Sequence, residues 1–309
     1  MQWRQIKTLF ILCFLVLNAY LLFMFFDKLE ELDYGLAENN EASTFKEQLE
    51  NEDIEISADL PEEELNESYI SVNQKSFTDK EVETLNGLGN QQSEVIEGNF
   101  IVSQFEEPVT IPEGADNNLI SEIVKSNILL PENYTYGTWN KEMNVLVFFQ
   151  EKRGLPIYYN QNGIVVVYLN SNNEMIFYTQ TMLGEAETPT EEKSLIKPID
   201  AIQVLFDGDR LWPEDEITDV NMGFHQRIPL PSGQQVFAPT WTITVNGEEK
   251  FYVNAMENLV FSSDEMTFLT DYISYTKERL QSLKDDNEVK EYVLNHLETM
   301  PTDNRSDTE

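Results

Sequence analysis

The 309-residue chain has few of the residue types on which reactive and metal sites depend. It contains one cysteine, Cys13, and two histidines, His225 and His296. Because Cys13 lies in an apolar N-terminal run, the rest of the chain has no disulfide and no thiolate metal site. The GxSxG, HExxH, GxxxxGK and GxGxxG patterns are also absent. We therefore expect no enzyme activity, no catalytic residue, no cofactor and no metal.

Basic residues are also scarce. The chain has 20 lysines and arginines against 56 acidic residues, a formal net charge of -36. Nucleic-acid binding requires clustered basic side chains, so this balance excludes nucleic acid as a partner. It also argues against the body of the protein lying on an anionic membrane surface. A hydrophobic content of 41% nevertheless indicates a folded chain rather than a disordered one.

One long uncharged segment is present, at residues 8–26 (TLFILCFLVLNAYLLFMFF). Its 19 residues approach the ~20 that a helix needs to cross a bilayer. Arg4 and Lys7 precede it, and acidic residues follow it, which predicts a cytoplasmic N-terminus at residues 1–7 and an extracytoplasmic body. The alternative is a cleavable signal peptide, but no small-residue cleavage site follows the run. We expect a single-pass protein of the cell membrane.

The predicted span contains one amide, Asn18, beside the small residue Ala19. An amide in hydrocarbon favours a partner, and small neighbours allow helices to approach closely. Asn18 and Ala19 are therefore the candidate contact residues for another membrane protein. The alternative is an amide tolerated without a partner.

Beyond the membrane, hydrophobic periodicity predicts an α+β body in several parts. Residues 27–68 form an acidic stalk and linker. Residues 69–183 form a first unit, with helices at 78–85 and 116–126 and strands at 95–104, 134–139, 144–151, 156–159, 163–169 and 174–182. The first helix opens with the capping box Thr78-x-x-Glu81. Residues 184–262 form a second unit, with a helix at 198–206 and strands at 217–228, 235–245, 250–254 and 259–261. Short loops between the strands predict antiparallel pairing.

The two units look like copies of one helix-plus-antiparallel-sheet pattern. Leu130-Pro131-Glu132 corresponds to Trp212-Pro213-Glu214, and Asn170 corresponds to Asn254 at a shift of 84 residues. A helical, acidic tail follows at 263–309, with Ser263 as its predicted cap and apolar residues at helical spacing up to Leu297. We expect the apolar face of the tail to pack on the body, with a partner-binding helix as the alternative.

Aromatic residues are concentrated in the predicted strands. They are Tyr158, Tyr159, Tyr168 and Tyr178 in the first unit and Trp241, Phe251 and Tyr252 in the second. Strand alternation would turn some of them outward, where exposed aromatic rings suit protein recognition. We expect most of them to lie in the core.

Three blocks resemble the YycI (WalI) family of low-GC Gram-positive bacteria. They are the N-terminus MQWRQIKTLFILCFLVLN, the run LPIYYN at 155–160 with its following strands, and the segment from Ala238-Pro-Thr-Trp241 to Tyr252-Val-Asn254. The resemblance covers about residues 1–262 and implies a two-unit body with PepSY-like halves. The tail after Asp264 has no counterpart that we can match.

The resemblance implies a regulator of the WalK/WalR (YycG/YycF) two-component system, which governs cell-wall metabolism. Its implied partners are the sensor histidine kinase WalK (YycG), reached through transmembrane contacts, and the related protein YycH. The alternative function is an extracytoplasmic wall-associated module that binds a ligand or inhibits a protease. Binding of wall fragments or a peptidase without YycH would favour that alternative.

Overall fold

The computed structural model describes residues 7, 12–18, 20–22, 24, 41–61, 65–187, 193–229, 234–261 and 264–300. The chain divides into two compact units, Met1–Glu55 and Ile56–Glu309. In the first unit residues 12–18 are helical, and helix α2 (Glu41–Asn51) follows. The second unit is a mixed α+β structure with a large sheet and several helices.

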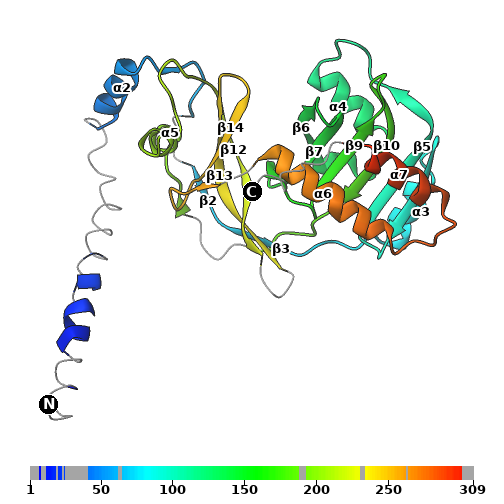
Figure 1. The fold of residues 1–309 in the computed structure, drawn as a ribbon, viewed down its shortest axis with the longest axis horizontal. Helices are drawn as coiled ribbons and strands as arrows, with labels where there is room; N and C mark the ends of the chain where they lie inside the picture. The colour runs from blue at the N-terminus through cyan, green and yellow to red at the C-terminus, as the bar shows by residue number, and fades with distance from the viewer. Residues whose placement is uncertain are drawn as a thin grey trace, which may run out of the picture. The chain divides into compact units, whose positions relative to one another are not determined.

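The sheet is the framework of the second unit (Figure 1). Among the described residues, thirteen strands join one sheet, whose main path runs β15-β14-β13-β12-β8-β7-β9-β10-β5-β4. Strands β1, β3 and β6 lie off this path, with β3 paired to β13 and β6 to β7, and β2 pairs with β11 in a separate two-stranded sheet. The bounds are β1 (Glu55–Ile56), β2 (Asn66–Glu67), β3 (Ile70–Val72), β4 (Gln91–Ile96), β5 (Phe100–Thr110), β6 (Tyr134–Asn140), β7 (Val145–Lys152), β8 (Leu155–Tyr158), β9 (Ile164–Leu169), β10 (Glu174–Thr181), β11 (Lys193–Ser194), β12 (Glu216–Pro229), β13 (Gln235–Val245), β14 (Glu249–Asn254) and β15 (Val260–Phe261).

The strand pairs of this sheet from β3 to β15 are antiparallel, as the short loops predict, with one exception. Strands β8 and β12 run parallel, with Ile157 opposite Phe224 and Tyr158 opposite His225. They are separated in sequence by β9, β10 and helix α5, so the connection is long enough for a parallel arrangement. Through this pair the strands of both predicted units join in one sheet.

The strand predicted at 95–104 is in fact a hairpin of two strands, β4 and β5. Glu97 and Gly98 both adopt positive φ angles, 49° and 75°, and the Asn99 amide donates to the Ile96 carbonyl. Ile96 pairs with Phe100, so the loop has three residues, and positive φ values at its first two are what a type I′ turn requires. The turn contains Glu-Gly rather than the commoner Asn-Gly or Asp-Gly. The sequence therefore contains no turn signal here, and a single strand was predicted across it.

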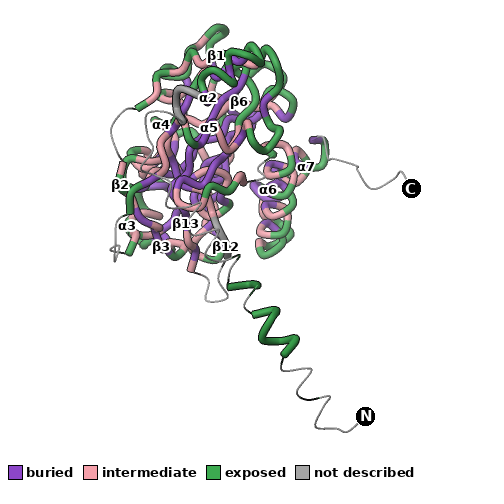
Figure 2. The backbone as a smooth tube through the Cα atoms, turned by 90° about the vertical axis from the view of Figure 1, so that its left-hand side faces the viewer, coloured by how far each residue is buried: buried purple, intermediate pink, exposed green. Residues whose placement is uncertain are grey.

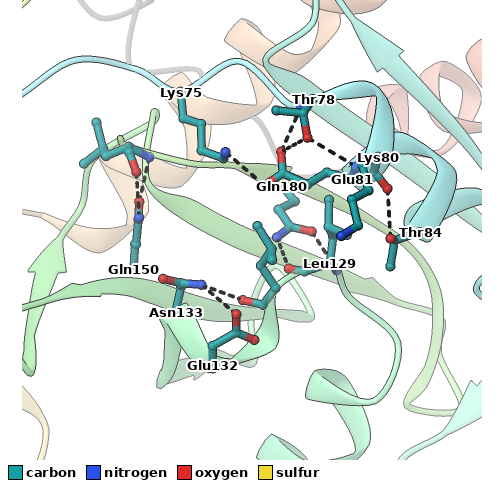
Figure 3. A network of polar contacts seen from close by, with 12 residues as sticks. Lys75, Thr78, Lys80, Glu81, Thr84, Leu129, Glu132, Asn133, Gln150 and Gln180 are labelled. Carbon is teal, nitrogen blue, oxygen red and sulfur yellow. Dashed lines mark hydrogen bonds and ion pairs between the residues drawn. The ribbon is translucent and has the colours of Figure 1, made fainter. Parts of the chain in front are cut away.

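The helices of the body begin and end close to the predicted residues. Helices α3 (Asp79–Asn86), α4 (Asn117–Lys125) and α5 (Pro198–Asp207) precede α6 (Glu265–Leu280) and α7 (Glu288–Glu298), and a short 3-10 turn, η1, covers Pro131–Asn133. The capping box at α3 is confirmed, because the Thr78 amide donates to Glu81 and the Glu81 amide donates to the Thr78 hydroxyl. Lys75 adds an ion pair to Glu81 at 2.9 Å (Figure 3).

Alternate residues of the central strands enter two different cores. Val145, Val147 and Phe149 of β7 pack with α6 and α7, whereas Leu146 and Phe148 pack with α3 and α4. Because helices cover both faces, β7 and β9 are buried along nearly their whole length, and Figure 2 shows buried backbone concentrated in the strands. This two-sided burial explains why these strands read as unbroken apolar runs.

The tail helices complete one of these cores, so the prediction that their apolar face packs on the body is confirmed. The predicted cap Ser263 lies outside the described residues; the cap is Asp264, whose carboxylate accepts from the Thr267 amide at 2.9 Å. The buried apolar residues of the two helices are Leu269, Tyr272, Ile273, Leu280, Val289, Val293 and Leu297.

Two buried glutamines link the sheet to the segments beside it (Figure 3). The Gln150 side chain donates to the Leu183 carbonyl at 2.9 Å and accepts from the Leu183 amide at 2.7 Å. Gln180 makes the same pair of bonds with Leu129. Each amide side chain thus replaces a missing backbone partner, which satisfies polar groups that would be costly to bury alone.

Candidate functional site

The N-terminal helical residues carry apolar side chains that are exposed in the isolated chain. Leu12, Phe14, Leu15 and Val16 are each 59–65% exposed, and the other apolar side chains described up to Met24 exceed 50%. Figure 2 shows the described residues of this stretch as exposed. The described ranges cover only part of residues 8–26. Within them, no helix is long and apolar enough to cross a membrane.

The structure describes one of the two candidate contact residues. Asn18 lies on the helical stretch, and its side-chain amide donates to the Phe14 carbonyl at 2.8 Å. This bond satisfies one N–H of the amide, which lowers the cost of placing it in hydrocarbon, while the second N–H and the oxygen retain bonding capacity. Ala19 lies outside the described residues, so the structure does not test the predicted pair.

In the body, aromatic residues from four elements meet where β8 lies between the two halves of the sheet. We call this cluster the aromatic seam. Its neighbouring ring centroids are 5.1–5.8 Å apart, a spacing typical of favourable aromatic pairs. Its members are Phe149 of β7, Tyr158 and Tyr159 at the end of β8, Tyr252 of β14 and Phe268 of α6. The expectation that most of the strand aromatics lie in the core is confirmed, since Tyr168, Tyr178, Trp241 and Tyr252 are all buried.

Two glycines make room for the seam. A methyl group on Gly223 would collide with the Tyr158 ring, and one on Gly137 would collide with the Phe149 ring. Each ring therefore lies close against the backbone of a neighbouring strand. Tyr159 itself has a φ of 46°, a left-handed conformation that is uncommon for a bulky residue.

Glu265, the first residue of α6, receives hydrogen bonds from two separate strands. Its Oε2 accepts from the Tyr159 hydroxyl and its Oε1 accepts from the Asn140 side chain, both at 2.9 Å. Burial of the phenol, with smaller contributions from Tyr252 and the Glu265 carboxylate, raises the pKa of Tyr159 far above its ordinary value. Tyr159 thus stays a proton donor at neutral pH, and Glu265 is held in a fixed orientation.

A pocket of about 530 Å³ opens beside this carboxylate. Its volume lies within the range of ~300–1,000 Å³ that is usual for ligand sites. Part of its wall is aromatic, formed by Tyr159, Phe251, Tyr252 and Phe261. Three of these four aromatic residues were singled out from the sequence. The sequence did not predict that Glu265, from the C-terminal tail, would lie beside them.

The two histidines lie in separate places. His225 of β12 stacks on Phe261 at 4.5 Å, and His296 of α7 meets the Phe177 ring edge-on at 5.3 Å. Burial lowers the pKa of both imidazoles. In the part of the chain that the structure describes, no group of three or more histidine, cysteine or acidic side chains could hold a metal ion.

Comparison with known families gives a match over most of the body. The sequence profile described as YycI protein matches residues 36–256. The chain belongs to the YycI family. The matched range covers every strand up to β14 and stops before α6, so the tail helices of this YycI family member lie beyond it. The apolar run at 8–26 also lies outside the matched range.

Two solved structures are similar to this YycI family member at low identity. An uncharacterized protein from Eubacterium rectale has a TM-score of 0.42 and 10% identity, covering 69% of this chain and 91% of its own. YycH from Bacillus subtilis has a TM-score of 0.39 and 13% identity, covering 65% of this chain and 54% of its own. At these TM-scores neither likeness supports an inference about this chain. No curated protein matches it.

One short block behind the family resemblance has a clear structural role in this YycI family member. Asn160, at the end of the LPIYYN run, is buried, and its side-chain amide donates to Gln226 at 2.8 Å and to Gln235 at 2.7 Å. It therefore ties the end of β8 to β12 and β13. The block thus helps to hold the two halves of the sheet together.

Proposed function

We propose that this protein is a membrane-anchored regulator of the sensor histidine kinase WalK (YycG), acting together with YycH in the two-component system that controls cell-wall metabolism. The observation that carries the proposal is the family match over residues 36–256. We assign the protein no catalytic step. Its effect on the kinase would come from binding alone.

The proposed anchor is the apolar run at residues 8–26. A helix that is apolar on all sides must be covered by protein or lipid, and the described side chains from Leu12 to Met24 are not covered within the chain. Arg4 and Lys7 would remain in the cytoplasm, which places the acidic body outside the cell. The proposed location is therefore a single-pass position in the cell membrane.

The proposed mechanism is a change in helix packing within the membrane. A regulator shifts a kinase between two states only if it binds one of them more tightly. Asn18 is suited to this role, because its bond to Phe14 leaves one N–H and the amide oxygen for a neighbouring helix.

The test is to replace residues 8–26 by one of two polyleucine spans of equal length, one fully leucine and one that keeps Asn18. Both should anchor the body, so kinase co-purification and the output of a WalR-dependent promoter report the contact itself. We expect the all-leucine span to lose both signals and the span with Asn18 to recover part of them. Unchanged promoter output and unchanged co-purification with the all-leucine span would rule out the intramembrane contact.

A further inference from the structure

The pocket beside Glu265 has charged as well as aromatic walls. Its acidic residues are Glu248, Glu249, Asp264 and Glu265, against the basic residues Arg210 and Lys250. Acidic residues thus outnumber basic ones in the pocket, as they do in the whole chain, which carries a net charge of -36. This balance disfavours an anionic occupant and favours a cationic one.

The Glu265 carboxylate is the best-defined polar group of this pocket. It is half-buried, and each oxygen already accepts one hydrogen bond, from Asn140 or Tyr159. A carboxylate has about four acceptor positions, so each oxygen can accept another donor. Two oxygens held in a fixed plane match the paired N–H groups of a guanidinium ion.

The aromatic wall fits the same chemistry. A guanidinium group is planar and weakly hydrated, and it stacks on aromatic faces while its edge binds a carboxylate. Tyr252 and Phe261 belong to neighbouring strands, and Tyr159 is held in its unusual backbone conformation beside them. The wall is therefore formed before any ligand arrives.

A second feature, near the pocket along the chain, favours a protein partner over a small cation. Trp212 is 68% exposed, the most exposed large apolar side chain among the described residues. It lies two residues from the lining residue Arg210. Asp215 accepts from the Trp212 amide at 2.7 Å and from the Asn246 side chain at 2.8 Å, which ties Trp212 to the turn that carries Glu248.

We propose that this pocket, together with Trp212, is a docking site for an arginine-bearing extended segment of a partner protein. The arginine would bind Glu265 and the aromatic wall, and Trp212 would cover the neighbouring residues of the segment. Tryptophan and arginine are both enriched among the residues that contribute most to protein binding. The site is built from residues 138–265, so it does not depend on the proposed contact in the membrane.

The experiment uses the full chain in detergent micelles and an acetylated hexapeptide of alternating glycine and arginine. A matched peptide carries citrulline, the neutral isostere of arginine. Binding is measured by calorimetry and by tryptophan fluorescence. We expect the arginine peptide to bind and the citrulline peptide to bind at least about ten-fold more weakly.

Two variants separate the pocket from the general acidity of the surface. Glu265→Gln keeps the acceptor for Tyr159 and should weaken arginine-peptide binding about ten-fold. Glu113→Gln removes the same charge from an exposed loop and should change binding less than about two-fold. Trp212→Phe should reduce both affinity and the fluorescence change. Equal binding of the two peptides, or equal losses in Glu265→Gln and Glu113→Gln, would overturn the proposal.

Discussion

The N-terminal helix and the α6–α7 hairpin both carry rows of apolar side chains, but only the hairpin buries them within the chain. Leu280 and Val293 of the hairpin are fully buried against the sheet, whereas Leu15 of the N-terminal helix is 65% exposed. The hairpin has an apolar stripe on one side and charged residues on the other, as a helix lying on a sheet requires. The N-terminal run at 8–26 carries no charged residue, so its apolar side chains would need protein or lipid to cover them.

Deleting the hairpin should have the largest effect. A chain that ends at residue 261 loses seven buried apolar side chains, worth roughly 1.5–3 kcal/mol each, and exposes the sheet face beneath them. That sum exceeds ~10 kcal/mol, comparable to the whole stability of a typical domain. We expect no cooperative thermal transition by circular dichroism and strong binding of a hydrophobic dye. A chain that ends at Met300 is the control and should unfold like the full protein; cooperative unfolding of the shorter chain would show that the hairpin is dispensable.

The same substitution placed in each region tests the comparison directly. Leu280→Ala leaves a cavity at a fully buried position and should cost about 2–5 kcal/mol in the free energy of unfolding. Leu15→Ala should leave the denaturant midpoint of the body unchanged, because no packing is lost there within the chain. Chemical denaturation in detergent measures both. A comparable loss from Leu15→Ala would mean that the N-terminal helix contributes to the body.

A smaller effect is expected from the polar attachment of the hairpin. Arg279 pairs with Glu97 at 2.6 Å, donates to the Ile96 carbonyl at 3.2 Å, and also donates to Asn99, all at the β4–β5 turn. Arg279→Met keeps the apolar stem but leaves these acceptors with fewer donors, so the free energy of unfolding should fall by about 1–3 kcal/mol. Lys277→Met, on the same helix, changes the charge equally and serves as the control in the same denaturation experiment. Equal losses would assign the effect to net charge rather than to the attachment.

The smallest expected effect is a pH dependence. Burial holds the pKa of His296 below 6.5, so as pH falls below about 6.5 the unfolded chain takes up a proton more readily than the folded one. The stability that the neutral His296 contributes is therefore fully present above that pH, and it decreases as pH falls towards the lowered pKa. The melting temperature should drop less between about pH 7.5 and 6 in His296→Gln than in the parent. Because His225 has a lowered pKa too, the double variant should be flatter still. If the melting temperatures of the parent and of His296→Gln fell equally with pH, His296 would not be a source of the pH dependence.

Much of the body could be predicted from local sequence, and the exceptions have physical causes. Thr78 and Glu81 specify the start of α3 because a capping box is a local interaction. The parallel pairing of β8 with β12 could not be predicted, because it depends on a distant segment. The β4–β5 turn was missed because Glu97 adopts a conformation that its residue type disfavours.

The candidate pocket was even harder to predict from local sequence than the sheet. Three of its four aromatic residues, Tyr159, Phe251 and Tyr252, stand out in the sequence because they lie in predicted β-rich runs. Glu265 and Asn140 are separated by 125 positions, and nothing local in either segment indicates that they bond. Trp212 was noticed only as part of the repeat match with Leu130-Pro131-Glu132, because exposure is a property of the fold rather than of the residue.

The short strand β8 has a mechanical consequence. It is joined to β7 through the pairs Glu151–Pro156 and Lys152–Leu155, and to β12 through Ile157–Phe224 and Tyr158–His225. The two broader leaves of the sheet are thus connected by a narrow strip with little backbone bonding on either side. Bending of one leaf relative to the other would be concentrated along this strip, and the edge-to-face and tilted rings of the aromatic seam would resist it.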